Sequence, residues 1–370
     1  MTEPMKYGQT EFEVHLPPEL IAAELEPNQV DLPQRTTAEH IRWALDHPID
    51  SAPLKELVKA GDKVCVVISD VTRRWQAPDT YLPILIGELE AAGVRDEDIL
   101  ILSATGTHRR QTEEEHIGLV TKPVYDRIRV EDHVCTDQDN LALNPGIGSG
   151  SNPAVRSANM NAANPVHADM MEACSMVRPT FLLNVVVNDE QEIIAAFAGN
   201  WVTAHRAACD LVDRMYGVPV KEKTPLVIAS AGGYPKDLNF YQTIKTLSNA
   251  LEVVADGGTL ILVTKSEEGF GSEDTQRQIA GFATMEEREK DLRENFSIGA
   301  FIGYLFAESA EKYHMIAVTD MAQEDFGTAR IHVVKTLDEA LELSRRLNGG
   351  RDLRATLLPH GANTLPKFQS

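Results

Sequence analysis

The sequence is poor in the features that mark disulfide-rich, zinc-binding and membrane proteins. It has four cysteines in 370 residues, and no two of them are close enough to form a CxxC pair. This count is too low for a disulfide framework, and the spacing excludes a zinc knuckle or a thioredoxin-type motif. No apolar run approaches the roughly 20 residues of a membrane span, and the N-terminus does not resemble a signal peptide. We therefore expect a soluble cytoplasmic protein.

Basic residues are scarce relative to acidic ones. The chain has 35 Lys and Arg against 56 Asp and Glu, which gives a formal net charge of −21. So acidic a chain repels phosphate backbones and anionic lipid surfaces, which argues against nucleic-acid and membrane partners. An anionic substrate would need a locally cationic pocket. The sequence also contains neither a GxGxxG fingerprint nor a P-loop, which disfavours nucleotide binding by these motifs.

The chain is long enough for two domains, and its hydrophobic fraction of 43% can fill two cores. Short β-branched runs alternate with helical periodicity, which is typical of α/β folds with mostly parallel sheets. We place the domains at 1–218 and 219–370, with the last residues able to pack back on the first domain. A long Gly-, Asn- and Ser-rich loop is expected over 140–164. The expected strands are 63–68, 99–102, 181–187, 226–229, 259–264, 315–318 and 331–334, and the expected helices are 80–92, 113–119, 169–176, 203–216, 239–254 and 337–347.

The first polar loop after a predicted strand reads SDVTRRW at 69–75. Ligands of open parallel sheets bind at the carboxyl ends of the strands, where such loops lie. This loop places Asp70, Thr72 and Arg73 just past a buried strand. An arginine fork suits a carboxylate or phosphate held by two contacts. The alternative is a surface Asp–Arg pair with a capping Asp.

The second loop reads SATGTHR at 103–109 and follows the next strand along the chain. Gly106 permits close approach of the backbone to a ligand, and His108 is a natural general base near neutral pH. Because adjacent parallel strands end at one edge, His108 and Arg73 are expected to be neighbours. The alternative is a solvated loop histidine. Among the other histidines, His133, His167 and His205 show no metal-ligand spacing and are expected to have a surface or structural role. His332 lies inside an apolar strand and is expected to be a packed structural residue.

The third loop reads GGYPKDLNFYQTIK at 232–245. Its glycine pair predicts a tight turn, and a helix N-terminus follows. Gln242 and Lys245 stand three residues apart and therefore share one helix face. Lys245 offers a point charge to a carboxylate, and Gln242 can donate and accept hydrogen bonds. The alternative is that both are ordinary exposed helix residues.

Together these three loops resemble the lactate racemase family of nickel-pincer-nucleotide enzymes, which includes related 2-hydroxyacid racemases and epimerases. Weaker matches are NPVHADMMEA at 164–173, NVVVNDEQEIIAAFAGN at 184–200 and LPHGANTLP at 358–366. The similarity spans nearly the whole chain in the expected order. It implies two α/β domains with the cofactor in the cleft between them. It also implies an isomerase that moves a hydride between a small 2-hydroxy acid and the nickel-pincer nucleotide.

The resemblance assigns roles and partners as well. Cofactor-maturation enzymes are the implied protein partners. His108 matches the base that takes the hydroxyl proton, and Arg73 and Lys245 belong to the catalytic set. The implied cofactor-binding residues are Asp70, Thr72 and Arg73, and the implied substrate-binding residues are Arg73, Tyr241, Gln242 and Lys245.

One departure from the family is large. Its members carry several dozen residues between the positions that match Asn140 and Leu141, including a second catalytic His, the Lys that anchors the cofactor and a nickel-ligating His. This chain has no Gly-Gly-x-Lys, and no His between His133 and His167, so no metal ligand is assigned. It is a shortened homologue, a chain from which the segment was removed, or a protein that holds the cofactor non-covalently. The alternative function is a non-catalytic homologue that binds a hydroxy acid or the cofactor.

Overall fold

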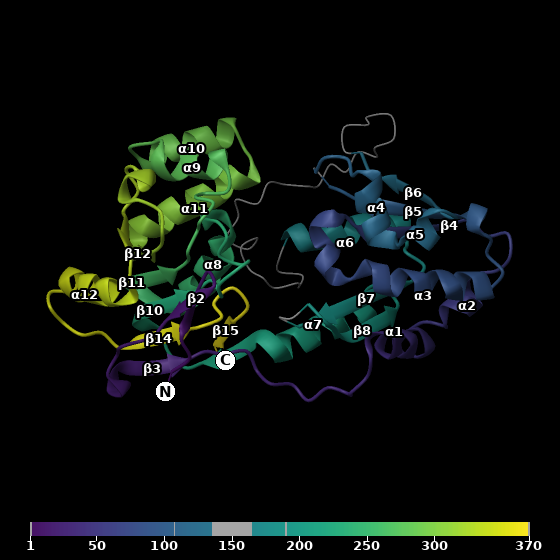
Figure 1. The fold of residues 1–370 in the computed structure, drawn as a ribbon, viewed down its shortest axis with the longest axis horizontal. Helices are drawn as coiled ribbons and strands as arrows, with labels where there is room; N and C mark the ends of the chain where they lie inside the picture. The colour runs from purple at the N-terminus through teal and green to yellow at the C-terminus, as the bar shows by residue number, and fades with distance from the viewer. Residues whose placement is uncertain (1, 107, 135–164, 189–190, 369–370) are drawn as a thin grey trace. The chain divides into compact units, whose positions relative to one another are not determined.

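The computed structural model describes residues 2–106, 108–134, 165–188 and 191–368. The chain divides into two compact units, Met1–Val30 with Asp213–Ser370 (unit 1) and Asp31–Val212 (unit 2). Figure 1 shows both. The loop predicted over 140–164 lies outside the described residues. Among the described residues, no helix is both long and apolar enough to span a bilayer.

Unit 1 is built on a six-stranded sheet in which every neighbouring pair is parallel. The predicted strands over 226–229, 259–264, 315–318 and 331–334 are present in this sheet. Residues 226–230, 259–263 and 315–318 of the central strands are buried because both faces of the sheet are covered, which explains their continuous apolar runs. The strand order is β13 (Ile331–Val334), β12 (His314–Val318), β11 (Val254–Val263), β10 (Thr224–Ser230), β14 (Ala355–Leu358) and β3 (Ile21–Glu24).

Two cores lie on the two faces of this sheet. One contains side chains of α8 and α11 around four phenylalanines, and the other contains α12 and the hairpin formed by β1 and β2. Helix α10 has almost no apolar residues (MEEREKDLRE), so no apolar periodicity predicts it. The bounds are β1 (Met5–Tyr7), β2 (Thr10–Phe12), η1 (Pro18–Leu20), α8 (Ile244–Val253), α9 (Glu273–Ala280), α10 (Met285–Glu294), α11 (Ile298–Lys312), η6 (Gln323–Phe326) and α12 (Leu337–Leu347).

The N-terminal residues belong to unit 1 and not to the unit that follows them in the chain. Strand β3 pairs in parallel with β14, and the Leu25 amide donates to the Leu357 carbonyl at 2.8 Å. The predicted first domain, 1–218, therefore differs from unit 2 at its start, because β3 forms the edge of the unit 1 sheet beside β14, a strand near the other end of the chain. The C-terminal strand β15 (Leu365–Phe368) pairs with β9 (Gly217–Val220), so the last strand also stays within unit 1.

Unit 2 has a smaller parallel sheet and an antiparallel hairpin. Helices α3 and α4 pack on one core with the sheet, and α1 packs on a second core with the hairpin. Thr112 and Glu115 form a capping box at the start of α4. The bounds are α1 (Thr37–Asp46), α2 (Leu54–Leu57), β4 (Val64–Ser69), η2 (Val71–Gln76), α3 (Pro78–Ala91), η3 (Asp96–Asp98), β5 (Ile99–Ala104), α4 (Glu113–Val120), α5 (Lys122–Tyr125), β6 (Arg129–Asp132), α6 (Pro165–Val177), β7 (Leu182–Val187), β8 (Ile193–Gly199) and α7 (Thr203–Tyr216).

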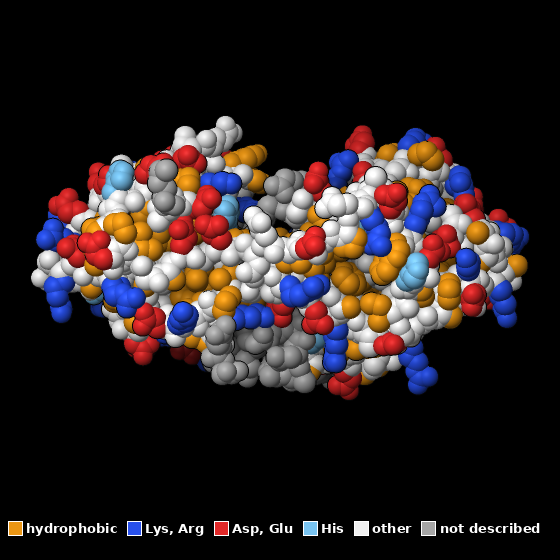
Figure 2. Space-filling view, turned by 90° about the horizontal axis from the view of Figure 1, so that it is seen from below, with side chains coloured by type: hydrophobic (Ala, Val, Ile, Leu, Met, Phe, Trp, Pro, Cys, Tyr) orange, Lys and Arg blue, Asp and Glu red, His pale blue; other side chains and the backbone are white. Residues whose placement is uncertain are grey.

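Acidic and basic side chains are intermingled on the face of the molecule seen in Figure 2. On the face seen in Figure 2, acidic side chains lie among basic ones and hydrophobic side chains are interspersed with both. A net charge of −21 is thus spread over the surface rather than gathered in one block on this face.

Candidate functional site

The loops after β4 and β5 meet because these strands are neighbours in the parallel sheet of unit 2. Ile68 is the register partner of Ser103, and Ser69 that of Ala104. Asp70 is the first residue after β4 and caps the short helix η2, while His108 lies on the loop after β5. The two predicted loops therefore share one sheet edge, as strand adjacency requires.

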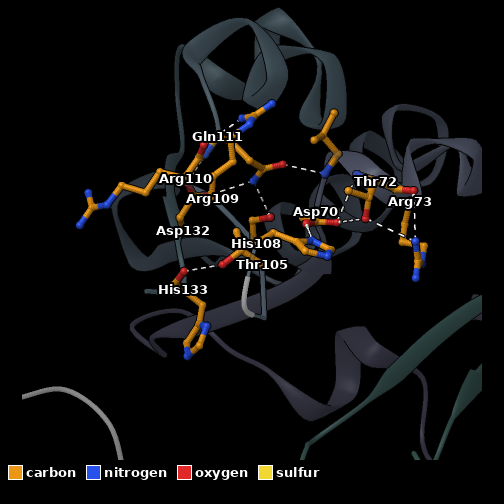
Figure 3. A network of polar contacts seen from close by, with 12 residues as sticks. Asp70, Thr72, Arg73, Thr105, His108, Arg109, Arg110, Gln111, Asp132 and His133 are labelled. Atoms are coloured by element: carbon orange, nitrogen blue, oxygen red, sulfur yellow. Dashed lines mark hydrogen bonds and ion pairs between the residues drawn. The ribbon is translucent and has the colours of Figure 1, made fainter. Parts of the chain in front are cut away.

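Asp70 and His108 form the most direct polar contact of this edge. The His108 Nδ1 lies 2.5 Å from the Asp70 Oδ2, and Figure 3 shows the two side chains pointing toward each other. The carboxylate is 5% exposed, whereas the imidazole is 51% exposed. An ionised carboxylate can only accept, so in the neutral imidazole the proton is on Nδ1 and the lone pair is on Nε2. The pair thus presents a basic nitrogen to solvent from a buried anchor.

Asp70 is kept ionised by its hydrogen bonds. Burial opposes its ionisation, but hydrogen bonds from Thr72 and His108 outweigh that effect and lower the pKa of Asp70. The Thr72 hydroxyl donates to Oδ1 at 2.5 Å, and the Thr72 amide donates to the same oxygen at 3.2 Å. Both carboxylate oxygens are therefore engaged, one by Thr72 and one by His108.

The arginines of this edge differ in what they contact. Arg109 donates two hydrogen bonds to Glu115, at 2.8 and 2.6 Å, and this pairing lowers the pKa of Glu115 to about 2. The Arg74 guanidinium packs against Gly118, where an added Cβ would lie 3.2 Å from it. Arg73 reaches only the Thr72 carbonyl and hydroxyl, both at 3.4 Å, and within the described part of the chain no carboxylate pairs with it. Arg73 is thus a cation of this loop that is available to an anionic ligand.

A second layer of polar side chains lies behind the pair, and the sequence did not predict it. Gln111 contacts Ser103, Asp132 and the main chain of Val71, and His116 donates to Asp132 at 2.8 Å. Ser103 and Asp132 are register partners on β5 and β6. The strand over 129–132 was not predicted, and its last residue, Asp132, lies at the same sheet edge as Asp70 and His108.

Asp132 supplies a pH-dependent test of this layer. Burial opposes its ionisation, but hydrogen bonds from His116 and Gln111 outweigh that effect and hold the pKa of Asp132 below its ordinary value of 3.8. Its stabilising effect is therefore full above that value and is lost as the pH falls through the folded-state pKa. We expect Asp132→Asn to lower the free energy of unfolding by about 1–3 kcal/mol near neutral pH, because the donors then face a weaker acceptor.

Urea unfolding of the wild type and Asp132→Asn, followed from about pH 7 down to about pH 3, measures this difference. The gap between the two proteins should narrow only at the acidic end of the series. A gap that stays constant throughout would contradict a stabilising ionised Asp132.

The third predicted loop lies at the carboxyl edge of the unit 1 sheet. Gly232 and Gly233 have φ values of +100° and +73°, which L-residues rarely adopt, and they form the predicted turn after β10. Asp237 is 1% exposed and accepts hydrogen bonds from the amides of Gly8 (2.6 Å) and Lys265 (3.1 Å). This loop is thereby tied to the N-terminal hairpin and to the loop after β11.

The helix predicted over 239–254 begins as a 3-10 turn. Asn239 caps η5 (Phe240–Thr243) by accepting the amide of Gln242 at 3.2 Å, and α8 follows from Ile244. Tyr241 and Gln242 are half-buried in this turn, and Lys245 is exposed in the first turn of α8. The Tyr241 amide donates to the Phe270 carbonyl at 3.2 Å, which fixes the turn to the neighbouring loop.

The predicted site residues thus fall into two groups. Asp70, Thr72, Arg73 and His108 lie together in unit 2, and the stretch 241–245 carries the others in unit 1. Within each group the side chains come from one sheet edge, which strand order alone explains.

The other histidines were expected to be structural. The rings of His167 and His205 stack with centroids 6.2 Å apart, and the Cys209 sulfur lies 3.7 Å from the His205 Nε2. Burial and the nearby His167 lower the pKa of His205. Over the ranges that the structure describes, no group of three or more His, Cys, Asp or Glu residues is arranged to hold a metal ion.

Comparison with known proteins gives consistent matches in sequence and in structure. Residues 7–170 match the lactate racemase N-terminal domain, and residues 220–365 match the lactate racemase C-terminal domain. A lactate racemase from Lactiplantibacillus plantarum is 27% identical, with 89% of this chain and 91% of that protein covered. A lactate racemase from Thermoanaerobacterium thermosaccharolyticum is 25% identical, with 97% of each chain covered.

Solved structures agree on the fold. The lactate racemase apoprotein of T. thermosaccharolyticum superposes with a TM-score of 0.84 at 23% identity, covering 98% of this chain and 99% of that one. A protein from Thermotoga maritima gives a TM-score of 0.57 at 16% identity, covering 90% and 98%. The sequence alignment with the T. thermosaccharolyticum relative spans 423 positions, more than the 370 residues of this chain. That relative therefore carries residues without a counterpart here.

Proposed function

Because this chain belongs to the lactate racemase family, we propose that it is an isomerase that interconverts the stereoisomers of a small 2-hydroxy acid of the lactate type. The observation that carries the proposal is the hydrogen bond between Asp70 and His108. It holds an exposed imidazole in the tautomer that can accept a proton, which is what deprotonation of a substrate hydroxyl requires.

The proton in this proposal moves from the substrate hydroxyl to the Nε2 of His108. The imidazolium that forms keeps its Nδ1–H bond to Asp70, whose lowered pKa means that the carboxylate stays ionised and stabilises the new charge. Return of the proton to the substrate restores the neutral imidazole. Asp70 acts on His108 and Thr72 acts on Asp70, so these two residues support the base in this proposal.

The substrate carboxylate needs cations, which this acidic chain supplies locally. Arg73 offers a planar fork without a described carboxylate partner, and Lys245 offers a point charge on an exposed helix turn. Tyr241 and Gln242 stand beside Lys245 on a turn anchored by Asn239. We propose that these residues bind and orient the carboxylate, as their family counterparts do by resemblance.

The nickel-pincer nucleotide of the family supplies hydride acceptance and return at the carbon that is inverted. The residues of this chain do not fit its usual attachment. The described residues form no metal-holding group of three or more His, Cys, Asp or Glu, and the sequence from 135 to 164 contains neither Lys nor His. A non-covalently held cofactor, delivered by cofactor-maturation enzymes, is the form that the proposal requires.

The lack of the family's cofactor anchor and nickel ligand favours a second candidate function. A family member without the anchor and the nickel ligand can still bind a hydroxy acid through Arg73 or Lys245. It would then be a binding protein that does not turn its ligand over.

Nickel content and isomerisation separate these functions. The protein is co-expressed with the cofactor-making enzymes, its nickel is measured by elemental mass spectrometry, and D- and L-lactate are followed by chiral chromatography. The isomerase predicts about one nickel per chain and interconversion of the two lactates. The binding protein predicts no nickel, no interconversion, and a lactate-dependent rise in melting temperature. A protein with none of these responses would contradict both functions.

A further inference from the structure

We propose that Gln111 is a positioning residue that holds the Asp70 and His108 loops together. The expected effect of Gln111 on the isomerisation rate rests on the proposed function. Its role in positioning the two loops does not. Gln111 touches neither Asp70 nor His108 directly. It acts through the main chain next to Asp70 and through its own place on the His108 loop.

Both the oxygen and the nitrogen of the Gln111 side-chain amide form hydrogen bonds. Its Oε1 accepts the Val71 amide at 2.7 Å, and its Nε2 donates to the Ser103 hydroxyl and to the Asp132 Oδ1, each at 2.7 Å. The orientation of the amide is fixed by chemistry, because a backbone N–H needs the oxygen and a carboxylate needs the NH₂. The Gln111 main-chain amide adds a bond to the Asp132 Oδ2 at 2.7 Å.

These contacts join the carboxyl ends of all three strands of the unit 2 sheet. Val71 follows β4, Ser103 lies near the end of β5, and Asp132 ends β6. Ser103 is fully buried, and Asp132 is held in turn by His116 at 2.8 Å. Figure 3 shows Gln111 between the Asp132 side and the Asp70 side of the network. The neutral side chain of Gln111 thus links the three strand ends at the sheet edge that carries His108.

The His108 loop needs such an anchor. Gly106 has a φ of +58°, and as a glycine it has no side chain with which to pack the loop at that point. On the N-terminal side of His108 the loop is held by Thr105, whose hydroxyl donates to the His133 carbonyl at 2.6 Å and whose carbonyl accepts the His108 amide at 3.0 Å. On the C-terminal side it is held by Gln111 and by Arg109, which pairs with Glu115. Loss of the Gln111 side chain removes its bonds to Val71 and Ser103 and so loosens this end of the loop, which places the imidazole against Asp70.

Two substitutions test the role from opposite directions. Gln111→Ala removes all three side-chain hydrogen bonds. Gln111→Glu keeps an acceptor for Val71 and the side-chain shape, but it places a carboxylate against Asp132 and removes both donors. The matched control is Arg110→Ala, the neighbouring residue of the same loop, whose side chain is exposed.

The first readout does not depend on activity. The Nδ1–H proton of His108, assigned with His108→Gln, is followed by NMR together with the pH titration of the ring. We expect both Gln111 variants to shift or broaden this resonance and to change the titration midpoint, while Arg110→Ala leaves both as in the wild type. Folded Gln111 variants with a wild-type resonance, or an equal change in Arg110→Ala, would overturn the proposal.

The second readout is kinetic and uses the nickel-loaded protein with lactate. We expect kcat to fall about 10–100-fold in Gln111→Ala with little change in KM, because a displaced base loses rate rather than substrate binding. A Gln111→Ala change confined to KM would overturn the catalytic part. A wild type with the NMR signal but no turnover would refute the proposed function and leave the positioning role supported.

A third variant covers the case in which Gln111→Ala does not fold. Ser103→Ala removes one of the acceptors of Gln111 and leaves the bonds to Val71 and Asp132. We expect a smaller change of the His108 resonance in the same direction. An unchanged resonance in this variant and in Gln111→Glu would overturn the proposal.

Discussion

His108→Ala is expected to lower the rate of lactate isomerisation about 10²–10⁴-fold, the usual contribution of a positioned general base. The imidazole is the exposed partner of a buried, ionised Asp70, at an Nδ1–Oδ2 distance of 2.5 Å. An alanine leaves no group to take the hydroxyl proton. The rate is measured by chiral chromatography with the nickel-loaded protein, starting from each lactate enantiomer in turn.

His133→Ala is the matched control for this prediction. His133 lies beside the same loop but takes part through its main chain, and Figure 3 shows its ring pointing away from Asp70 and His108. Its substitution should leave the rate within about twofold of the wild type. Undiminished isomerisation in His108→Ala would refute the role of His108 as the base.

Phe240→Ala is expected to lower the free energy of unfolding of unit 1 by about 3–5 kcal/mol, the cost of removing a large aromatic side chain from a packed core. Phe240 is completely buried, and its ring centroid lies 4.5 Å from that of Phe306 and 5.1 Å from that of Phe326. Its amide also donates to the Gly269 carbonyl at 2.9 Å, in the turn that carries Tyr241 and Gln242. The substitution therefore opens a cavity beneath the proposed carboxylate-binding turn.

Urea unfolding followed by far-UV circular dichroism measures this loss. The tryptophans Trp43, Trp75 and Trp201 all lie in unit 2, so their fluorescence reports the other unit separately. Phe296→Ala is the control, because Phe296 is 54% exposed in the same unit and its loss should change the stability by less than about 0.5 kcal/mol. Equal stability of the Phe240 and Phe296 variants would contradict the central role of the phenylalanine cluster.

Local pattern was sufficient for the longer strands and for several of the helices. Runs of β-branched residues predicted β4, β5, β10, β11, β12 and β13. In β10, β11 and β12 these runs are continuous because both faces of the strand are buried, whereas in β4 the side chains of Cys65 and Val67 are exposed. Helical spacing predicted α3, α7, α8 and α12. Pattern failed where periodicity is weak, as in the charged helix α10, and where a strand is short, as in β3. In those places tertiary partners rather than local sequence fix the structure.

Motif and resemblance located the candidate base but not its partner. The loops 69–75 and 103–109 were recognised from residue type and spacing, and strand adjacency predicted that they meet. The loops of His108 and Arg73 share one sheet edge, as expected, and the hydrogen-bond partner of the imidazole within that edge is Asp70. A carboxylate at the N-cap of η2 points back toward the sheet edge, and the arginine three residues later points outward. Spacing along a loop does not reveal which side chain turns inward.

The sequence by itself determined the α/β class, the family and the loops that carry the polar residues, because apolar periodicity and short motifs are local properties of the chain. Only the tertiary structure decided that β3 completes the unit 1 sheet and that Asp70 rather than Arg73 holds His108. It alone brought Gln111 to the ends of three strands. Each of these contacts joins residues distant along the chain or on separate loops, and their geometry follows from sheet order and register, which no local pattern encodes.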